Sequence, residues 1–336
     1  MRNEEKIMFS LRELYAQYGY RRYKMNKFEE YDFYAENKEF LVSGNVITFT
    51  DGSGRLMALK PDVTLSIARH HTDDAGVDRV YYSENVYRAQ NGEFCEIPQT
   101  GLECIGALDA FTVGETVLLA VKSLAAVGRP FKLCISHMGL LTAAIKAVGL
   151  SDAAGTALLK AVESKSVARI RALCEGNGGD KAACETLCTL TDAFGSLHDV
   201  LPALQPLAPA DVFAELTAID AFLQAAGYGD AVQFDFSLSG DTQYYNGVVF
   251  CGFIEGVSRA VLSGGRYDLL MQKLGKKSDA IGFAVYLDLL ERLQTASSET
   301  DMPLRLTYTI DTMGETVKKA EELRAQGKTV LVEKGE

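Results

Sequence analysis

Positive charge is scarce in this sequence of 336 residues. Lys and Arg number 34 against 45 Asp and Glu, which gives a formal net charge of −11 at pH 7, and no long basic run occurs. Proteins that bind nucleic acid normally concentrate Lys and Arg to neutralise phosphates. The charge balance therefore disfavours a nucleic-acid partner.

Long apolar segments are also lacking. The first residues, MRNEEKIMF, carry acidic side chains where a signal peptide needs an unbroken apolar stretch. The most apolar segment, residues 113–127, is interrupted by Glu115 and Lys122. We therefore expect a cytoplasmic protein with no membrane partner.

Paired cysteines and spaced histidines are missing as well. The seven cysteines are an odd, scattered number, which argues against a disulfide framework. Cys174, Cys184 and Cys188 fall in an Ala- and Leu-rich helical pattern without zinc-site spacing, so we interpret them as helix packing. Because the four histidines show no ligand spacing beyond the adjacent His70 and His71, we expect no metal.

The sequence contains no phosphate-binding loop of the Rossmann or P-loop pattern and no nucleophile elbow. The nearest Gly-rich turn, residues 263–266, reads SGGR and lacks the GxGxxG spacing. We therefore predict no nucleotide cofactor and no catalytic residue from local motifs.

Apolar residues make up 47% of the chain and the mean hydropathy is 0.00, which suits a protein with a large core. Hydrophobic periodicity and turn residues predict an α+β fold, with hairpins alternating with helices. The predicted helices lie at residues 3–17 and 63–70, around Val113 to Leu124, and from near Ile281. The predicted strands lie at residues 46–50, 55–59, 79–87, 93–105, 131–136, 232–236, 244–254 and 261–267. Between the first two strands, Asp51-Gly52 predicts a turn with glycine at positive φ.

The character of the sequence changes between residues 151 and 228. Apolar residues, Phe194 among them, recur at helical spacing among many alanines. We predict a helical insertion at 151–228 in a core domain formed by 1–150 and 229–298. The pattern of residues 299–336 predicts a β-α-β tail that is too small to bury a hydrophobic core of its own.

Polar residues interrupt two strands in which apolar residues would be the default. Gln99 and Glu103 stand four apart, hence on one face of a strand, among Gly101 and Gly106. This face is either a ligand bed or the solvated side of a sheet. Tyr244 and Tyr245, before Asn246-Gly247, are either exposed at a turn or part of a pocket wall.

Several ordered motifs resemble those of histidyl-tRNA synthetases. Residues 49–64 (FTDGSGRLMALKPDVT) resemble the region before class II motif 2, and NVYR at 85–88 through PQTGLECIG at 98–106 resembles motif 2 itself. YYNGVVF at 244–250 is similar to the histidine-specific loop, SGGRYD at 263–268 to the following strand, and AIGFA at 280–284 to the start of motif 3. The resemblance implies a class II aminoacyl-tRNA synthetase-like antiparallel sheet flanked by helices, with the tail resembling the start of an anticodon-binding domain.

The sequence departs from the synthetases where ATP chemistry needs cations. The motif 3 arginine is replaced by Leu289, after Asp288, and the arginine four residues before the tyrosine pair is replaced by Gly240. Glu93 and Glu96 stand where synthetases carry basic residues. An aliphatic side chain cannot replace a fixed guanidinium fork on a phosphate.

A retained amino-acid pocket with lost ATP and tRNA machinery resembles the regulatory subunit of ATP phosphoribosyltransferase. That resemblance implies a partner, the short-form catalytic subunit of the first step of histidine biosynthesis. It also implies activation of that partner, histidine feedback inhibition and no catalysis by this chain. A homodimer within a hetero-oligomer is the family expectation, although residues 25–30 lack the proline of class II motif 1.

The resemblance also implies a histidine site. Asp62, Thr64 and Gln99 would meet the α-amino end, and Glu103 with Tyr244 and Tyr245 would meet the imidazole. Arg88 would pair either with the ligand carboxylate or with an internal acid. The alternatives are a divergent enzyme that forms an aminoacyl adenylate and a plain amino-acid-binding module.

Overall fold

The computed structural model describes residues 3–41, 46–73, 76–90, 92–238, 244–291, 293 and 303–335. By its internal contacts the chain divides into two compact units, Met1–Leu293 and Gln294–Glu336. The helical segment therefore shares a unit with the main sheet. The division into 1–150 with 229–298, 151–228 and 299–336 stays a proposal.

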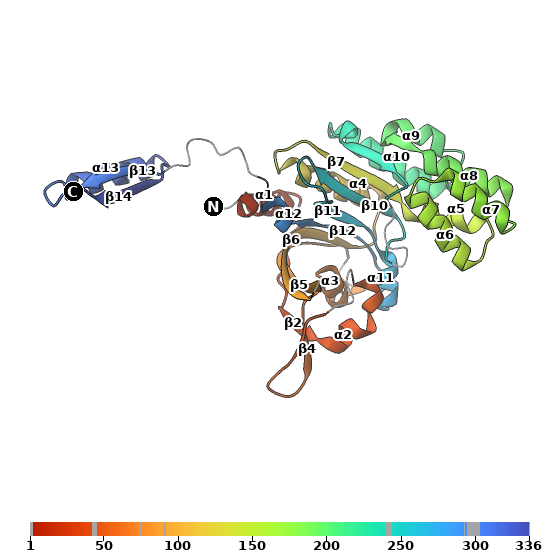
Figure 1. The fold of residues 1–336 in the computed structure, drawn as a ribbon, viewed down its shortest axis with the longest axis horizontal. Helices are drawn as coiled ribbons and strands as arrows, with labels where there is room; N and C mark the ends of the chain where they lie inside the picture. The colour runs from red at the N-terminus through yellow and green to blue at the C-terminus, as the bar shows by residue number, and fades with distance from the viewer. Residues whose placement is uncertain are drawn as a thin grey trace. The chain divides into compact units, whose positions relative to one another are not determined.

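A nine-stranded sheet, counted over the described residues, forms the centre of the first unit (Figure 1). Its order is β1-β5-β6-β12-β11-β10-β7-β9-β8, and neighbours are antiparallel except β1 with β5 and β7 with β9. The strands are β1 Arg21–Arg22, β5 Asp78–Gln90, β6 Glu93–Gly106, β7 Phe131–His137, β8 Phe194–Ser196, β9 Val232–Asp235, β10 Val248–Ile254, β11 Leu262–Arg266 and β12 Asp279–Tyr286. The predicted α+β class, an antiparallel sheet flanked by helices, is confirmed.

Helices cover both faces of this sheet and bury a separate core on each. On β6, Leu102 and Cys104 join the core that contains α4 (Ala110–Ala125) and α1 (Asn3–Gln17). Ile105 joins the core under α2 (Tyr31–Glu36), α3 (Thr64–His70) and α11 (Asp268–Lys273). Because alternate side chains point to opposite faces of a strand, Gln99 and Glu103 belong to the second face.

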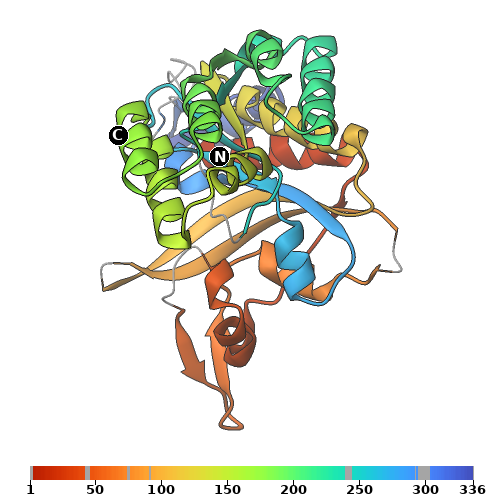
Figure 2. The same cartoon turned by 90° about the vertical axis from the view of Figure 1, so that its right-hand side faces the viewer.

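A small sheet of order β2-β4-β3 extends from the second face (Figure 2). Its strands are β2 Phe28–Glu30, β3 Thr48–Thr50 and β4 Leu56–Leu59. A short 3-10 helix, η1 Lys38–Phe40, lies between α2 and β3 in the chain. The hairpin between β3 and β4 is confirmed, but its positive φ of 86° belongs to Gly54. The expectation for Gly52 was wrong, because the Asp51 side chain forms the turn by accepting the N–H groups of Ser53 and Arg55 at 2.9 Å each.

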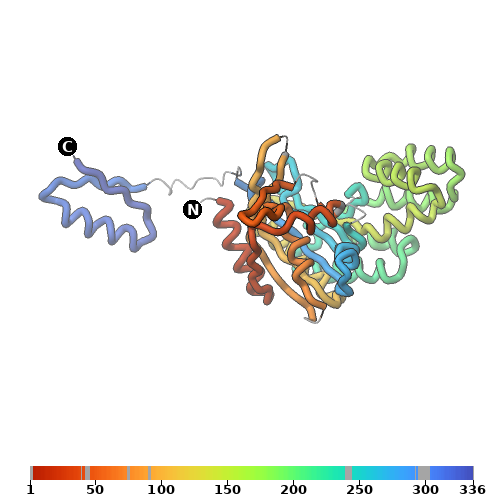
Figure 3. Tube along the Cα trace, turned by 90° about the horizontal axis from the view of Figure 1, so that it is seen from below, coloured from red at the N-terminus to blue at the C-terminus, as the bar shows by residue number. Residues whose placement is uncertain are grey.

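The helices that follow β7 in the chain gather in one group beside the sheet (Figure 3). They are α5 Met138–Ala147, α6 Asp152–Glu163, α7 Val167–Gly176, α8 Lys181–Asp192, α9 Leu197–Leu204 and α10 Ala210–Ala225, followed by η3 Gly229–Ala231. The helical prediction fails at Phe194, which begins the strand β8. Gly195 has a φ of 151°, which no helix accommodates, so the chain extends there and pairs with β9.

Two predictions around the later strands were wrong. No helix begins near Ile281: residues 279–286 form β12, and α12 (Leu287–Glu291) follows it. The strand predicted at 244–254 begins only at Val248, and Tyr244 to Gly247 form a turn.

The second unit is the predicted β-α-β motif. It contains β13 Leu304–Tyr308, α13 Met313–Ala325 and β14 Val330–Lys334, with the two strands parallel. Among the described residues, none of the helices combines the length and apolar character needed to span a bilayer.

Candidate functional site

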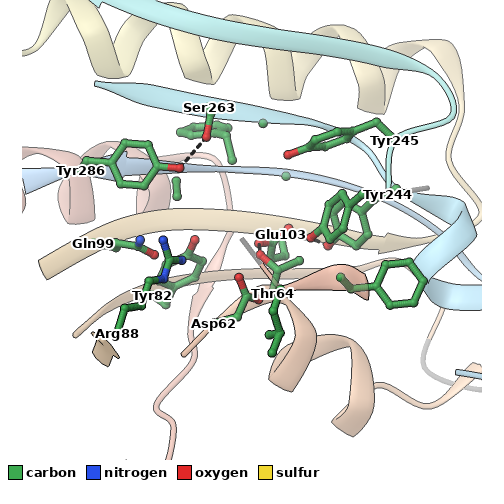
Figure 4. Close-up of a pocket in the computed structure, with 17 residues that line it drawn as sticks. Asp62, Thr64, Tyr82, Arg88, Gln99, Glu103, Tyr244, Tyr245, Ser263 and Tyr286 are labelled. Carbon is green, nitrogen blue, oxygen red and sulfur yellow. Dashed lines mark hydrogen bonds between the residues drawn. The ribbon is translucent and has the colours of Figure 1, made fainter. Parts of the chain in front are cut away.

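A pocket of about 330 Å³ opens on the second face of the main sheet (Figure 4). Strands β5, β6, β11 and β12 form its floor, and the start of α3, the turn before β10 and the end of η1 form its sides. The volume lies within the range of small-ligand sites. Its lining residues are Phe40, Leu41, Asp62, Thr64, Tyr82, Arg88, Gln99, Glu103, Tyr244, Tyr245, Ser263, Gly264, Tyr267, Gly282, Phe283, Ala284 and Tyr286.

The structure brings all seven residues of the predicted histidine site into this one pocket. They are Asp62, Thr64, Arg88, Gln99, Glu103, Tyr244 and Tyr245. Gln99 and Glu103 are 5% and 1% exposed, so the face they share is not the solvated side of a sheet. Tyr244 and Tyr245 form one side of the pocket, which we call the tyrosine wall.

Glu103 is held at the base of the pocket by two hydroxyl donors. Thr64 Oγ1 donates to its Oε1 at 2.7 Å, and the Tyr267 hydroxyl donates to its Oε2 at 2.6 Å. Burial raises the pKa of Glu103 to about 8, although these two hydrogen bonds lower it, and nearby Asp62 adds to the increase. Near pH 7 the protein environment therefore favours a neutral carboxyl group at Glu103.

Glycines make room for this buried acid. A Cβ atom on Gly282 of β12 would lie 1.8 Å from Glu103 Oε2. A Cβ atom on Gly101 would lie 2.6 Å from the Tyr82 hydroxyl and 2.1 Å from the Phe283 carbonyl oxygen. The absence of side chains at these two positions thus gives the pocket its depth.

Aromatic rings enclose the Glu103 end of the pocket. The Tyr244 ring lies 4.7 Å from Tyr245, 5.7 Å from Tyr267 and 6.1 Å from Phe40, measured between centroids. Burial raises the pKa of Tyr244 and Tyr267 well above the usual value. Their hydroxyls are therefore protonated donors around a flat, apolar enclosure.

Asp62 and Arg88 provide opposite charges farther along the pocket. Asp62 Oδ1 accepts the Leu65 N–H at 2.8 Å, at the first turn of α3. Burial raises the pKa of Asp62, whereas that N–H and the Arg88 charge lower it. Arg88 is 7% exposed and its Nε donates to the Pro61 carbonyl oxygen at 3.2 Å. Within the described part of the chain, no carboxylate lies within 4 Å of the Arg88 guanidinium.

Gln99 and a hydroxyl pair stand at the Arg88 end (Figure 4). The hydroxyls of Ser263 and Tyr286 are 2.6 Å apart, across β11 and β12. The polar groups are therefore ordered along the pocket: a carboxyl among aromatic rings, then Asp62, then a cation with amide and hydroxyl groups.

Sequence reasoning assigned no role to four polar residues of the pocket, which are Tyr82, Ser263, Tyr267 and Tyr286. Tyr267 and Ser263 lie in the quoted SGGRYD motif, so the information was present, but nothing there showed which carboxyl group Tyr267 would meet. Tyr286 follows the quoted AIGFA motif in a segment predicted to be helical. Its contact with Ser263 depends on the antiparallel register of β11 and β12, which pairs Ser263 with Ala284.

The structure describes two of the positions at which this sequence lacks the cations of the synthetases, Leu289 and Glu96. Leu289 lies on α12 and packs against the core, and Gly240 lies outside the described residues. Glu96 accepts hydrogen bonds from Asn85 and from the Tyr87 hydroxyl, the latter at 3.0 Å. Neither Leu289 nor Glu96 lines the pocket, and neither supplies a positive charge.

The three cysteines that the sequence places in a helical pattern do lie in helices. Cys174, Cys184 and Cys188 are buried in α7 and α8, in the core of the helical segment. No group of three or more His, Cys, Asp or Glu residues that could hold a metal ion occurs in the ranges that the structure describes.

Comparison with known proteins agrees with the fold. A protein of Clostridium kluyveri named ATP phosphoribosyltransferase regulatory subunit is 28% identical over 334 residues, covering 94% of this chain and 85% of its own length. The crystal structure of an ATP phosphoribosyltransferase regulatory subunit/histidyl-tRNA synthetase from Bacillus halodurans C is 26% identical. It has a TM-score of 0.82 and covers 99% of this chain and 88% of that one.

A more distant structure shares the fold alone. A chain of the ATP phosphoribosyl transferase complex from Thermotoga maritima is 20% identical with a TM-score of 0.68, covering 84% of this chain and 97% of that one.

The family model described as Histidyl-tRNA synthetase matches residues 1–290. The resemblance predicted from the ordered motifs is therefore confirmed, and the chain belongs to the histidyl-tRNA synthetase family.

Proposed function

We propose that this chain is a regulatory, histidine-sensing subunit that works with a short-form catalytic subunit of ATP phosphoribosyltransferase, in the first step of histidine biosynthesis. Support comes from relatives that carry the name of that regulatory subunit over nearly the whole chain. The Thermotoga maritima chain of similar fold belongs to an ATP phosphoribosyl transferase complex. In this proposal the chain activates its partner and takes part in feedback inhibition.

The observation that carries the ligand assignment is the order of charges along the pocket. Histidine presents an imidazole, an ammonium and a carboxylate. Glu103 and the tyrosine wall match the imidazole, which needs hydrogen-bond partners for its ring nitrogens and an apolar enclosure. Asp62, with Thr64 and Gln99, matches the ammonium. Arg88, a buried cation without a carboxylate within 4 Å among the described residues, matches the ligand carboxylate.

Catalysis by the chain itself is disfavoured by the chemistry of adenylation. Transfer of an adenylyl group needs cations on the reacting phosphate. Leu289 is an aliphatic residue packed against the core, and it supplies no such charge. We therefore assign the pocket to the sensing of histidine. We also propose that the chain works as a homodimer within a hetero-oligomer.

The partner assignment is tested by adding the purified full-length chain to a short-form catalytic subunit. The expected result is a higher rate of phosphoribosyl transfer and a rate that histidine inhibits. A catalytic subunit whose rate and histidine response are both unchanged, at concentrations at which the two chains comigrate, would contradict the proposal.

The ligand assignment is tested by calorimetry with each of the twenty amino acids. We expect selective binding of histidine, weakened by about 1–3 kcal/mol in Glu103→Ala. Glu96→Ala is the matched control, because Glu96 lies on the same strand with its side chain on the opposite face. Equal affinity of the two variants would exclude Glu103 from ligand recognition.

A second candidate function is the formation of an aminoacyl adenylate. The one observation that favours it is Arg88, since a buried cation with no carboxylate within 4 Å among the described residues suits a phosphate as well as a carboxylate. Histidine-dependent exchange of pyrophosphate into ATP would support this function. Absence of exchange, with histidine binding intact, would leave the regulatory function.

A further inference from the structure

A buried aspartate holds the turn that carries the tyrosine wall. Asn246, which follows Tyr245, donates from Nδ2 to Asp268 Oδ2 at 2.9 Å, and the Asp268 N–H donates to Asn246 Oδ1 at 3.0 Å. Asp268 is 5% exposed, and its Oδ1 accepts the Ala280 N–H at 2.9 Å. This carboxylate therefore fixes the turn together with two backbone hydrogen bonds, from the Asn246 N–H to the Arg266 carbonyl oxygen at 3.2 Å and from the Met138 N–H to the Gly247 carbonyl oxygen at 2.8 Å.

The guanidinium of Arg266 binds that carboxylate and two others. Its Nε donates to Asp268 Oδ2 at 2.7 Å, and its two terminal nitrogens donate to Glu215 at 3.1 Å and to Asp279 at 3.0 Å. Its aliphatic stem lies against the same turn, because a Cβ atom on Gly247 would be 2.8 Å from Arg266 Cδ. One side chain thus joins the turn to α11, β12 and α10.

Glu215 brings the helical segment into this cluster. It lies on α10, and its second oxygen is 3.3 Å from His137 Nε2 at the start of α5. His137 Nδ1 accepts the Leu140 N–H at 3.2 Å, so in the neutral ring the proton is on Nε2; among the described residues, Glu215 Oε1 nevertheless accepts no hydrogen bond. Glu215 is therefore held by the hydrogen bond from Arg266 on one oxygen, and its other oxygen lies beside the His137 ring.

We propose that Arg266 is a positioning residue for the tyrosine wall and that Glu215 is its anchor in the helical segment, so that the state of α10 and occupancy of the pocket are linked. The second part rests on the proposed function, because it requires histidine to bind against the tyrosine wall. A planar fork with fixed donor directions can hold three carboxylates at once, whereas a lysine ammonium offers a single point of charge.

The first test follows amide hydrogen exchange in the full-length chain without ligand. Glu215→Gln keeps the shape of the side chain but removes its charge. We expect exchange in peptides covering residues 244–250 to rise several-fold, with no comparable rise in the β5–β6 hairpin. Exchange equal to wild type, or a uniform rise over the whole chain, overturns the proposal.

Two further variants separate positioning from general stability. Glu185→Gln breaks an exposed pair with Arg171, whose two nitrogens lie 3.0 and 2.8 Å from the Glu185 oxygens. Because this pair lies in the helical segment away from Arg266, we expect no change at residues 244–250. Arg266→Lys should reproduce Glu215→Gln, and a wild-type exchange pattern in Arg266→Lys contradicts the role of the fork.

The second test adds histidine at saturation. In wild type we expect slower exchange both at residues 244–250 and at the first turns of α10, residues 210–217. In Glu215→Gln we expect protection at 244–250 only. Protection confined to 244–250 in wild type overturns the link to α10. If histidine does not bind to wild type, the proposed function fails, while the ligand-free test still decides the role of Arg266.

Discussion

Glu103 is enclosed so completely that its ionised form is the unfavourable one. Both oxygens accept hydroxyl hydrogen bonds, yet burial outweighs them and raises the pKa to about 8. An acid in this state can either donate a proton to a ring nitrogen or, once ionised, accept an N–H. The pocket therefore contains a residue that suits imidazole, whose own pKa lies near 6.5.

The raised pKa of Glu103 predicts a pH-dependent stability of the empty protein. The folded-state pKa of about 8 lies above the usual 4.5. The protonated Glu103 therefore contributes its full share to the free energy of unfolding below pH 4.5, and this contribution is lost as the pH rises to about 8. Glu103→Gln removes this loss. Denaturant titrations should show the free energy of unfolding of the variant gaining on that of wild type as the pH rises from 5 to 8, by up to about 1.4 kcal/mol per pH unit. A difference that does not vary with pH would contradict the raised pKa.

Arg88 predicts a second difference, between ligands with and without a carboxylate. Wild type should bind histidine more tightly than histamine by roughly 1.5–3 kcal/mol, the range for hydrogen bonds to charged groups. In Arg88→Gln the two affinities should converge, as measured by calorimetry. Arg79→Gln, on the opposite face of the same strand, should retain the wild-type preference. A preference for histidine that survives in Arg88→Gln would place the carboxylate elsewhere.

At the scale of elements, the pocket depends on how closely β12 approaches β6. Gly282 is paired with Glu103 across these strands, and a Cβ atom there would be 1.8 Å from Glu103 Oε2 and 2.5 Å from the Leu102 carbonyl oxygen. Neither strand can yield easily, because both lie inside the sheet with a neighbour on each side.

Gly282→Ala should therefore displace the Glu103 carboxyl group and break its hydrogen bond with Tyr267. We expect a loss of roughly 1–3 kcal/mol in the free energy of unfolding and a loss of histidine binding. Gly52→Ala is the control, because no atom lies within 4 Å of the added Cβ and its φ is not positive. Chemical denaturation and calorimetry on both variants test this. Full binding by Gly282→Ala would show that the two strands separate at low cost.

Elements with a strong local pattern were predictable from the sequence. The helix at residues 3–17 and the long pair of strands around Gly92 follow from apolar spacing and turn residues. The error at Ile281 has a physical cause. Residues 279–286 form an inner strand buried on both faces, so their apolar run shows no alternation and looks like a buried helix.

The site was predictable to the extent that its residues occur in ordered motifs. The seven predicted residues lie in one pocket, and their role in binding histidine stays a prediction. Tyr286 could not be found, because its place in the pocket depends on the pairing of β11 with β12, which is a long-range property. Arg266 was visible in a motif, but its three carboxylate partners come from segments up to 51 residues away.

At the scale of the whole molecule, the sheet separates two tasks. One face buries the core with α1 and α4, and the other carries the pocket under α3 and the small sheet. All the lining residues of the pocket, from Phe40 to Tyr286, belong to the compact unit Met1–Leu293. The β-α-β unit contributes none of these lining residues. Within its described residues, the buried apolar side chains are Ala320 and Val330.

This division predicts that the chain can be shortened without loss of the pocket. A variant ending at Leu293 should bind histidine within about twofold of the full-length affinity, since the folding of each domain depends on its own core. Calorimetry measures the affinity, and a denaturant titration checks that the shortened chain unfolds in one transition near the full-length midpoint. If the shortened chain folds but loses histidine affinity, the β-α-β unit must contribute to the site. If it keeps that affinity but no longer raises the activity of the catalytic subunit, the unit acts in the complex rather than in sensing.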